Sequence, residues 1–248
     1  MEQLIIDEKK LYKKPLLVDT EHHESDIYIH DERTLYKILL SSGRVLREQS
    51  VYRLSQYTNP NTVLPKDLLY DEHYKFIGYS MDYLTDHQVS RDIIFGDKSF
   101  EERQKFAFRV ASIIENFMND GFVYWDIHSE NIMYYKDDIK IIDMDGVRFR
   151  DDYSTDAYRF EQMSAHQSLA LLCLSYMAGI EFLEFPKVLN YEQLQQLFGP
   201  LFEGTYLEGM FQDLFDYPTK LIRPTQFIMD LNEDDMAHFK TKLVRLLK

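Results

Sequence analysis

The chain has 248 residues, a formal charge of −14 at pH 7 and one cysteine, Cys173. This length suits one two-lobed domain or two small ones, and the acidic charge argues against a nucleic-acid or anionic-membrane surface and favours a basic or neutral partner. An internal disulfide is excluded, and Cys173 lies in an apolar run that predicts a buried structural thiol. The first ten residues lack the features of a signal peptide, and the longest apolar run, residues 169–180, is shorter than the about 20 residues that span a bilayer. We therefore expect a cytoplasmic protein.

The first third of the chain predicts short strands and one helix. Three stretches of β-branched or aromatic residues, 16–18, 27–29 and 34–39, are separated by polar turns. Residues 41–43, Ser-Ser-Gly, end the third strand and begin a helix whose apolar positions approximate one face. Two further strands are expected at residues 68–70 and 75–79, ahead of the tetrapeptide Met-Asp-Tyr-Leu at residues 81–84.

Most of the chain after residue 84 is predicted to be helical. Ser99 and Glu102 have the spacing of a capping box, and apolar residues recur at helical spacing until the stop signal Asp120-Gly121. An apolar helix is expected around residues 169–174. A final helix is expected from the spacing of Met236, Phe239, Leu243 and Leu246.

Residues 124–149 have the layout of a phosphoryl-transfer site. Asp126 and Asn131 share a loop, as they must if one meets a substrate hydroxyl and the other holds a metal ion. The turn Lys136-Asp137-Asp138 separates two β-rich stretches, which predicts a hairpin whose far end delivers Asp143. A carboxylate and an amide at the two ends of such a hairpin suit Mg²⁺, which takes few protein oxygens and adds substrate phosphates.

Asp145 is a candidate for a further metal ligand. It lies two residues after Asp143, and on an extended backbone side chains two apart point the same way. The alternative is that Asp145 is a turn or cap residue.

The segment resembles the catalytic loop and metal motif of the protein-kinase-like superfamily, in which His-Arg-Asp, four residues and Asn precede a hairpin and Asp-Phe-Gly. Tyr124-Trp125-Asp126 corresponds to the first triplet and Asp143-Met144-Asp145 to the last. The resemblance implies that Asp126 is the catalytic base and that Asn131 and Asp143 are metal ligands. It also implies an α+β, two-lobed fold, with a small antiparallel-sheet N-lobe carrying one helix (residues 1–84) and a mainly helical C-lobe (residues 85–248).

The same resemblance assigns nucleotide-binding roles to the N-lobe. Lys37, on the third predicted strand, would hold phosphates, and Glu48 on the following helix would fix its ammonium. The alternative is that both are solvated charges. Met81, Asp82 and Tyr83 resemble the interlobe hinge, whose backbone meets adenine. ATP and Mg²⁺ are therefore the implied cofactors.

The chain departs from ordinary protein kinases in several places. Residues 19–25 replace the glycine-rich loop with a segment that has no glycine and three carboxylates, which would repel a triphosphate unless Mg²⁺ or a lysine intervenes. Trp125 replaces the arginine that binds a phosphorylated activation loop. The segment after Asp145 is short and lacks Ala-Pro-Glu. His128 stands where protein kinases often have a lysine that contacts the transferred phosphate, which implies a nucleotide-binding role for it, and a histidine there is typical of aminoglycoside and choline kinase-like enzymes.

Another motif supports the protein-kinase branch. Asp216-Tyr217-Pro218 and Arg223-Pro224-Thr225 resemble a signature near the end of those enzymes, where the arginine pairs with the missing glutamate. Arg223 then needs another carboxylate, for which the candidates are Asp151, Asp152 and Glu161.

Three functions follow from these observations. The first is an ATP- and Mg²⁺-dependent kinase that acts on a Ser or Thr hydroxyl of a protein. The second is a small-molecule kinase with a cationic acceptor, which His128, the short segment and the acidic charge favour. The third is a pseudokinase interaction module, favoured by the missing glycines and Trp125. Nucleotidyl transfer also stays open, because the same metal site could hold the nucleotide the other way round.

Overall fold

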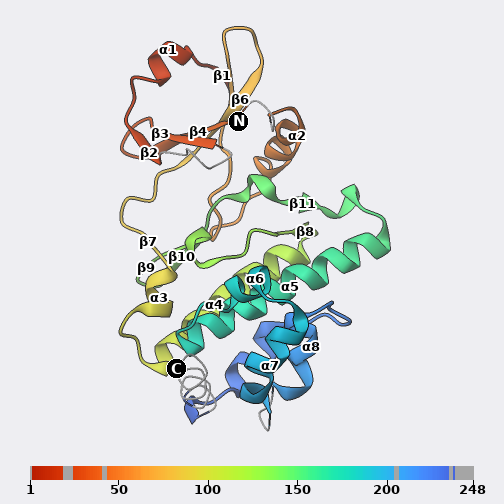
Figure 1. The fold of residues 1–248 in the computed structure, drawn as a ribbon. Coiled ribbons are helices and arrows are strands. Elements are labelled where there is room, and N and C mark those ends of the chain that lie inside the picture. Colours follow the sequence, from red (N-terminus) through yellow and green to blue (C-terminus); the bar gives the residue numbers. More distant parts are fainter. Residues whose placement is uncertain (1, 19–24, 41–43, 204–206, 235–236, 238–248) are drawn as a thin grey trace. The chain divides into compact units, whose positions relative to one another are not determined.

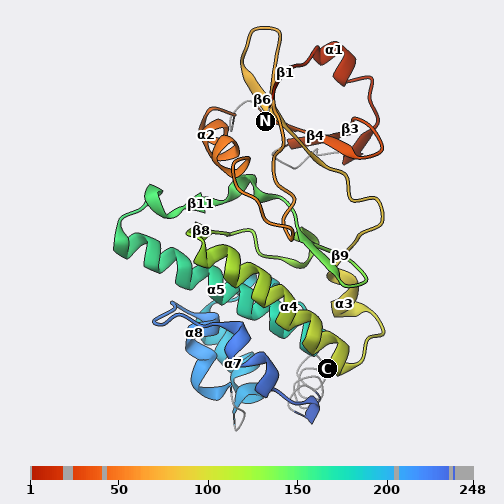
Figure 2. The same cartoon turned by 180° about the vertical axis from the view of Figure 1, so that it is seen from behind.

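The chain forms an α+β structure with a mixed sheet and several helices (Figures 1 and 2). The computed structural model describes residues 2–18, 25–40, 44–203, 207–234 and 237. The glycine-free loop at residues 19–24, the turn at residues 41–43 and the C-terminal helix positions Met236, Phe239, Leu243 and Leu246 lie outside the described residues.

Two compact units make up the chain, and neither is continuous in sequence. The first unit contains residues 1–88 and 133–147, and the second contains residues 89–132 and 148–248. The expected division was 1–84 and 85–248, so the predicted hairpin groups with the first part of the chain and not with the second.

A six-stranded sheet forms the framework of the first unit. Its order is β1 (Gln3–Ile5), β5 (Leu68–Tyr70), β6 (Phe76–Asp82), β4 (Thr34–Leu39), β3 (Ser25–Ile29) and β2 (Leu16–Val18). The predicted strands 16–18, 34–39 and 68–70 are confirmed, and those at 27–29 and 75–79 are longer or shifted by a few residues. The expectation of a wholly antiparallel sheet is wrong at one edge, because β1 was not predicted and pairs in parallel with β5.

Strand β4 is buried on both faces, which explains its central place. Leu35 and Leu39 pack in one cluster with Val51 of helix α2 (Arg44–Leu54), whereas Tyr36 and Ile38 pack in another, which contains Leu11. Because side chains alternate along a strand, Lys37 lies on the face of Leu35 and Leu39. A lysine on this face is forced into the interior, where its ammonium needs ionic partners.

The predicted hairpin is confirmed and is tied to the first unit. It consists of β9 (Ile132–Tyr135) and β10 (Asp138–Ile141), with Lys136 in the left-handed region at φ 53°. β7 (Gln88–Val89) is the third strand of this sheet. The backbone of Ile141 exchanges two hydrogen bonds of 2.8 Å with the segment 61–63, so the hairpin delivers the 3₁₀ turn η2 (Met144–Gly146) to the same unit.

Two long helices form the centre of the second unit. α4 (Phe100–Asn119) and α5 (Thr155–Ala178) lie side by side in both views (Figures 1 and 2). The capping box is confirmed: Ser99 Oγ accepts from the Glu102 amide, and the Ser99 amide donates to the Glu102 carboxylate. α5 begins well before the apolar run that predicted it, and Cys173 is buried within it. The shorter elements are α3 (Arg91–Phe95), β8 (Phe122–Val123), η1 (Ser129–Asn131), β11 (Arg148–Phe149), η3 (Arg150–Asp152), η4 (Phe182–Glu184), α6 (Phe185–Val188), α7 (Tyr191–Phe202), η5 (Glu208–Met210), α8 (Phe211–Phe215), η6 (Pro224–Gln226) and η7 (Ile228–Asp230).

Arg223 has a different carboxylate partner from those predicted. Its guanidinium lies 3.8 Å from Glu115 of α4, and Glu115 also accepts hydrogen bonds from the amide and hydroxyl of Thr225, at 3.0 and 2.7 Å. Glu115 is buried, so its charge has to be paired where η6 covers α4. The candidates Asp151, Asp152 and Glu161 were therefore wrong.

The helices of the described ranges do not include a membrane span. Each of them is too short or too polar to cross a bilayer.

Gly78 provides a test of how closely β4 and β6 approach each other. It pairs with Ile38, and a Cβ at this position would lie 2.0 Å from the Lys37 carbonyl oxygen. We expect Gly78→Ala to lower the free energy of unfolding of the first unit by about 3 kcal/mol, since neither backbone can move without breaking the ladder. Gly146→Ala is the control in the same unit, because its new methyl group would meet no atom within 4 Å apart from the adjoining backbone and chain neighbours. Urea unfolding of both variants, monitored by circular dichroism, measures this difference. Equal midpoints for the two variants would contradict the close approach.

Candidate functional site

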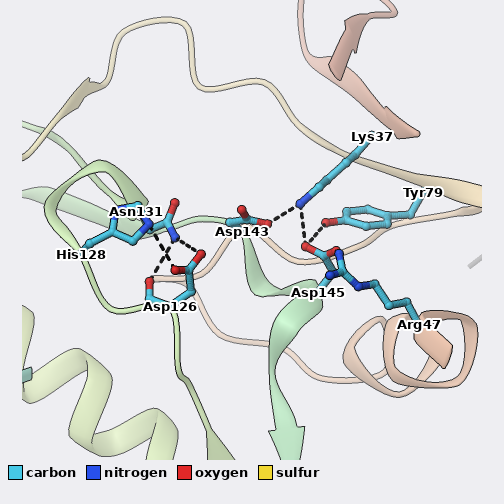
Figure 3. Close-up of polar contacts among 8 residues, drawn as sticks. All are labelled: Lys37, Arg47, Tyr79, Asp126, His128, Asn131, Asp143 and Asp145. Atoms are coloured by element: carbon cyan, nitrogen blue, oxygen red, sulfur yellow. Dashed lines mark hydrogen bonds and ion pairs between the residues drawn. The ribbon is translucent and has the colours of Figure 1, made fainter. Parts of the chain in front are cut away.

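The first unit contains a buried lysine that binds two carboxylates. Lys37 is 4% exposed on β4, and its Nζ donates a hydrogen bond to Asp143 Oδ1 and another, of 2.6 Å, to Asp145 Oδ1 (Figure 3). The structure therefore brings together three of the residues that the sequence singled out, from β4 and from the turn after the hairpin.

The backbone at Asp143 explains how both carboxylates reach the same ammonium. Asp143 adopts the left-handed conformation, with φ 59° and ψ 53°, and is the residue directly before η2. The expectation of an extended backbone was therefore wrong, although both side chains do point to one cation. Their exposure differs strongly: the Asp143 side chain is 41% exposed and that of Asp145 is 1% exposed.

Asp145 has two further partners that the sequence did not reveal. Arg47 of α2 donates a hydrogen bond of 2.6 Å to Asp145 Oδ2, and the Tyr79 hydroxyl donates one of 3.2 Å to Oδ1 (Figure 3). Tyr79 lies on β6 directly opposite Lys37. A signal for Tyr79 was present in the strand pattern, since antiparallel neighbours face the same side.

The predicted pair of Lys37 and Glu48 is wrong. Glu48 Oε1 instead accepts a hydrogen bond of 2.9 Å from the Tyr70 hydroxyl. Arg47 precedes Glu48 by one residue, and successive residues of a helix are rotated by about 100° around its axis. The residue of α2 that faces η2 is thus the cation, and the carboxylate points elsewhere.

The charges of this cluster shift the pKa values of its members. Burial and the neighbouring Asp145 raise the pKa of Asp143 to about 6. Burial alone would also raise the pKa of Asp145, but Lys37 and Arg47 outweigh it and hold that pKa below its ordinary value. Burial alone would lower the pKa of Lys37, but its interactions with Tyr79, Asp145 and Asp143 raise that pKa well above its usual value. Of these two carboxyl groups, Asp143 is therefore the one whose pKa lies above its ordinary value.

The second unit holds the other half of the predicted motif. The Asn131 amide nitrogen donates to the Asp126 carboxylate at 2.8 Å and to the Asp126 carbonyl oxygen at 3.0 Å, while His128 Nε2 lies 3.3 Å from the Asp126 carboxylate (Figure 3). The Asp126 side chain is 55% exposed, whereas Asn131 is 6% exposed. A buried amide thus orients an exposed carboxylate, which is the arrangement that a group meeting a substrate hydroxyl requires.

The two predicted metal ligands Asn131 and Asp143 belong to different units. The Asn131 side-chain nitrogen donates to Asp126, and the side-chain oxygen accepts no hydrogen bond from the residues that the structure describes. Asp143 presents a partly exposed carboxylate in the other unit. Within the described ranges no group of three or more His, Cys, Asp or Glu residues could hold a metal ion by itself.

The predicted hinge residues continue strand β6. Met81 is buried and pairs with Leu35, and Asp82 pairs with Thr34 and forms an ion pair with Lys66. The Tyr83 amide donates a hydrogen bond of 2.9 Å to the Arg33 carbonyl oxygen. The Tyr83 N–H group is therefore engaged within the sheet and not presented to a ligand.

Comparisons with known proteins add no family assignment. No protein-family model matches the chain, and no curated protein matches it.

The pKa of His128 tests the geometry of the second-unit cluster. Burial lowers this pKa, but the hydrogen bond and charge of Asp126 raise it to a net value above the ordinary one. We expect Asp126→Asn to lower the pKa of His128, measured by NMR titration of its ring protons. Asp156→Asn removes the same charge from an exposed site on α5 and should leave that pKa unchanged. A His128 pKa that is equal in the wild type and Asp126→Asn would show that the pair does not form.

Proposed function

We propose that the chain is an ATP- and Mg²⁺-dependent phosphotransferase of the protein-kinase-like type that transfers phosphate to a Ser or Thr hydroxyl of a protein. The observation that carries this proposal is the contact of the buried Lys37 with Asp143, which follows the hairpin that begins directly after Asn131. Such a lysine and carboxylate are the parts that phosphoryl transfer needs to hold phosphates and metal. A two-lobed kinase-like fold is part of the proposal.

Lys37 would hold the phosphate groups of the nucleotide. An ammonium has three N–H donors, and two of them are directed at Asp143 and Asp145. The third can be donated to a phosphate oxygen while the contact with Asp145 persists. The strand that carries Lys37 is held in the interior of the sheet, so the position of its ammonium is fixed before the nucleotide binds.

Asp143 and Asn131 have donor atoms that fit Mg²⁺. The ion prefers carboxylate and amide oxygens, and both the partly exposed Asp143 carboxylate and the Asn131 amide oxygen are of this type. When bound, Mg²⁺ would neutralise charge on the phosphates. Its binding requires the ionised form of Asp143, whose pKa of about 6 allows this form at neutral pH.

Asp126 would act on the acceptor. Its carboxylate would accept the proton of the acceptor hydroxyl while the hydroxyl oxygen attacks the γ-phosphorus and the bond to ADP breaks. Asn131 orients this carboxylate, and His128 lies beside it. Most of the rate would come from orientation and charge neutralisation.

A cationic small molecule is the second candidate acceptor. Asp126 contacts His128 directly and Glu130 also raises the pKa of His128, whereas Lys187 acts against them. An amine-bearing acceptor would be attracted to this acidic surrounding. The two candidates differ in where the phosphate appears, on a protein or on a metabolite.

Ligand-induced stabilisation tests the nucleotide and metal site. We expect Mg²⁺ with ATP at 100 times its dissociation constant to raise the unfolding midpoint of the wild type by roughly 5–10 °C. Asp143→Asn should lose the Mg²⁺-dependent part of this rise, whereas Asp137→Asn, in the hairpin turn, should keep it. No rise in the wild type would favour an interaction module without nucleotide binding.

Transfer of labelled γ-phosphate tests the role of Asp126. We expect Asp126→Asn to reduce transfer on the order of 100-fold or more while ATP still stabilises the protein, because the base acts on the acceptor and not on the nucleotide. The label should be followed in parallel on basic protein substrates and on amine-bearing metabolites. A variant with full activity would rule out Asp126 as the base.

A further inference from the structure

The Asp145 carboxylate joins three segments of the first unit. It follows the hairpin in η2, and its contacts come from β4, β6 and α2. We infer that Asp145 is a positioning residue, which fixes the Lys37 ammonium by linking it to Arg47, and that it does not bind metal. This inference rests on the proposed function only in that Lys37 holds phosphate.

The hydrogen bonds of Asp145 leave little room for a metal ion. Oδ1 accepts from Lys37 at 2.6 Å and from Tyr79 at 3.2 Å, and Oδ2 accepts from Arg47 at 2.6 Å. Both oxygens are thus engaged, and the side chain is 1% exposed. A divalent cation here would have to displace donors from two positive groups and then lie beside them, which Coulomb repulsion opposes.

Asp143 and Asp145, both predicted from the sequence as metal ligands, therefore have different tasks. The Asp143 side chain is 41% exposed and can exchange Lys37 for a metal ion. The buried Asp145 has to stay paired, since an uncompensated buried charge is strongly destabilising. Lys37 consequently stays hydrogen-bonded to Asp145 when Asp143 binds a metal ion.

Arg47 completes the link to helix α2. Its side chain is 24% exposed and reaches the Asp145 oxygen that Lys37 does not use. The connection from helix to lysine thus runs from a helix cation through a turn carboxylate to the strand ammonium. Any shift of α2 that withdraws Arg47 would loosen Asp145 and, through it, Lys37.

A measurement without nucleotide tests the link directly. We expect the ¹H–¹⁵N signal of the Lys37 ammonium, assigned by its loss in Lys37→Met, to exchange slowly with water in the wild type. Arg47→Gln and Asp145→Asn should both speed this exchange at least about tenfold, because Asp145→Asn removes the carboxylate charge that holds the ammonium and Arg47→Gln removes the partner that fixes this carboxylate. Arg53→Gln removes the same charge from the same helix and should leave it unchanged. Wild-type exchange in Arg47→Gln would overturn the inference.

Metal and nucleotide titrations separate positioning from metal binding. We expect Arg47→Gln and Asp145→Asn each to weaken ATP binding by about 10- to 100-fold at saturating Mg²⁺ while the Mg²⁺ concentration for half-maximal binding stays at the wild-type value. The double variant should be no weaker than the weaker single variant, because the two residues act as one unit. A raised Mg²⁺ requirement in Asp145→Asn, together with wild-type behaviour of Arg47→Gln, would make Asp145 a metal ligand and refute the inference.

The proposed function and the inference about Asp145 can be refuted independently of each other. A wild type that binds no ATP would refute the proposed function, while the exchange of the Lys37 ammonium would still decide whether Asp145 and Arg47 hold it. If Asp145→Asn does not fold, as judged by circular dichroism, both tests can be made with Arg47→Gln alone, because Arg47 is partly exposed.

Discussion

The burial of the Lys37 ammonium is the constraint on which the first unit depends. A positive charge on an interior strand is tolerated only where carboxylates compensate it. Those carboxylates arrive from far along the chain, since Asp143 and Asp145 lie 106 and 108 positions after Lys37. The hairpin has to return to the sheet for the lysine to be stable, and its hydrogen bonds to residues 61–63 secure that return.

The same constraint gives two nearby aspartates different chemistry. Asp145 lies between Lys37 and Arg47, so its negative charge is stabilised and its pKa is low. Asp143 is near that fixed negative charge, so partial burial and this neighbour raise its pKa to about 6. One carboxylate is thereby structural and the other is exchangeable, although both belong to a single turn. In the second unit, the two ends of one side-chain amide also differ. The nitrogen of the buried Asn131 amide donates to the exposed Asp126 carboxylate and orients it, whereas the amide oxygen does not take part in this contact.

Local signals predicted the elements better than the contacts between them. Strand alternation, the hairpin turn and the capping box at Ser99 each involve neighbouring residues, and all three were confirmed. The contribution of α2 to the cluster could not be predicted, because it depends on which polar residue of α2 faces η2. A rotation of the helix by one residue separates Arg47 from Glu48, and no local pattern fixes that rotation. The partner of Arg223 was missed for a similar reason, since Glu115 lies inside a helix predicted only from its apolar face.

The interleaved course of the chain has a consequence for how this protein can be divided. The backbone passes between the units after residues 88, 132 and 147, so a single cut cannot release either unit whole. A fragment that ends at Gln88 would contain the complete six-stranded sheet and a buried lysine without its counterions. Recombination that exchanges the first unit between related chains would therefore need three junctions. The segment 133–147 would have to be exchanged together with the sheet, because it carries the carboxylates that neutralise Lys37.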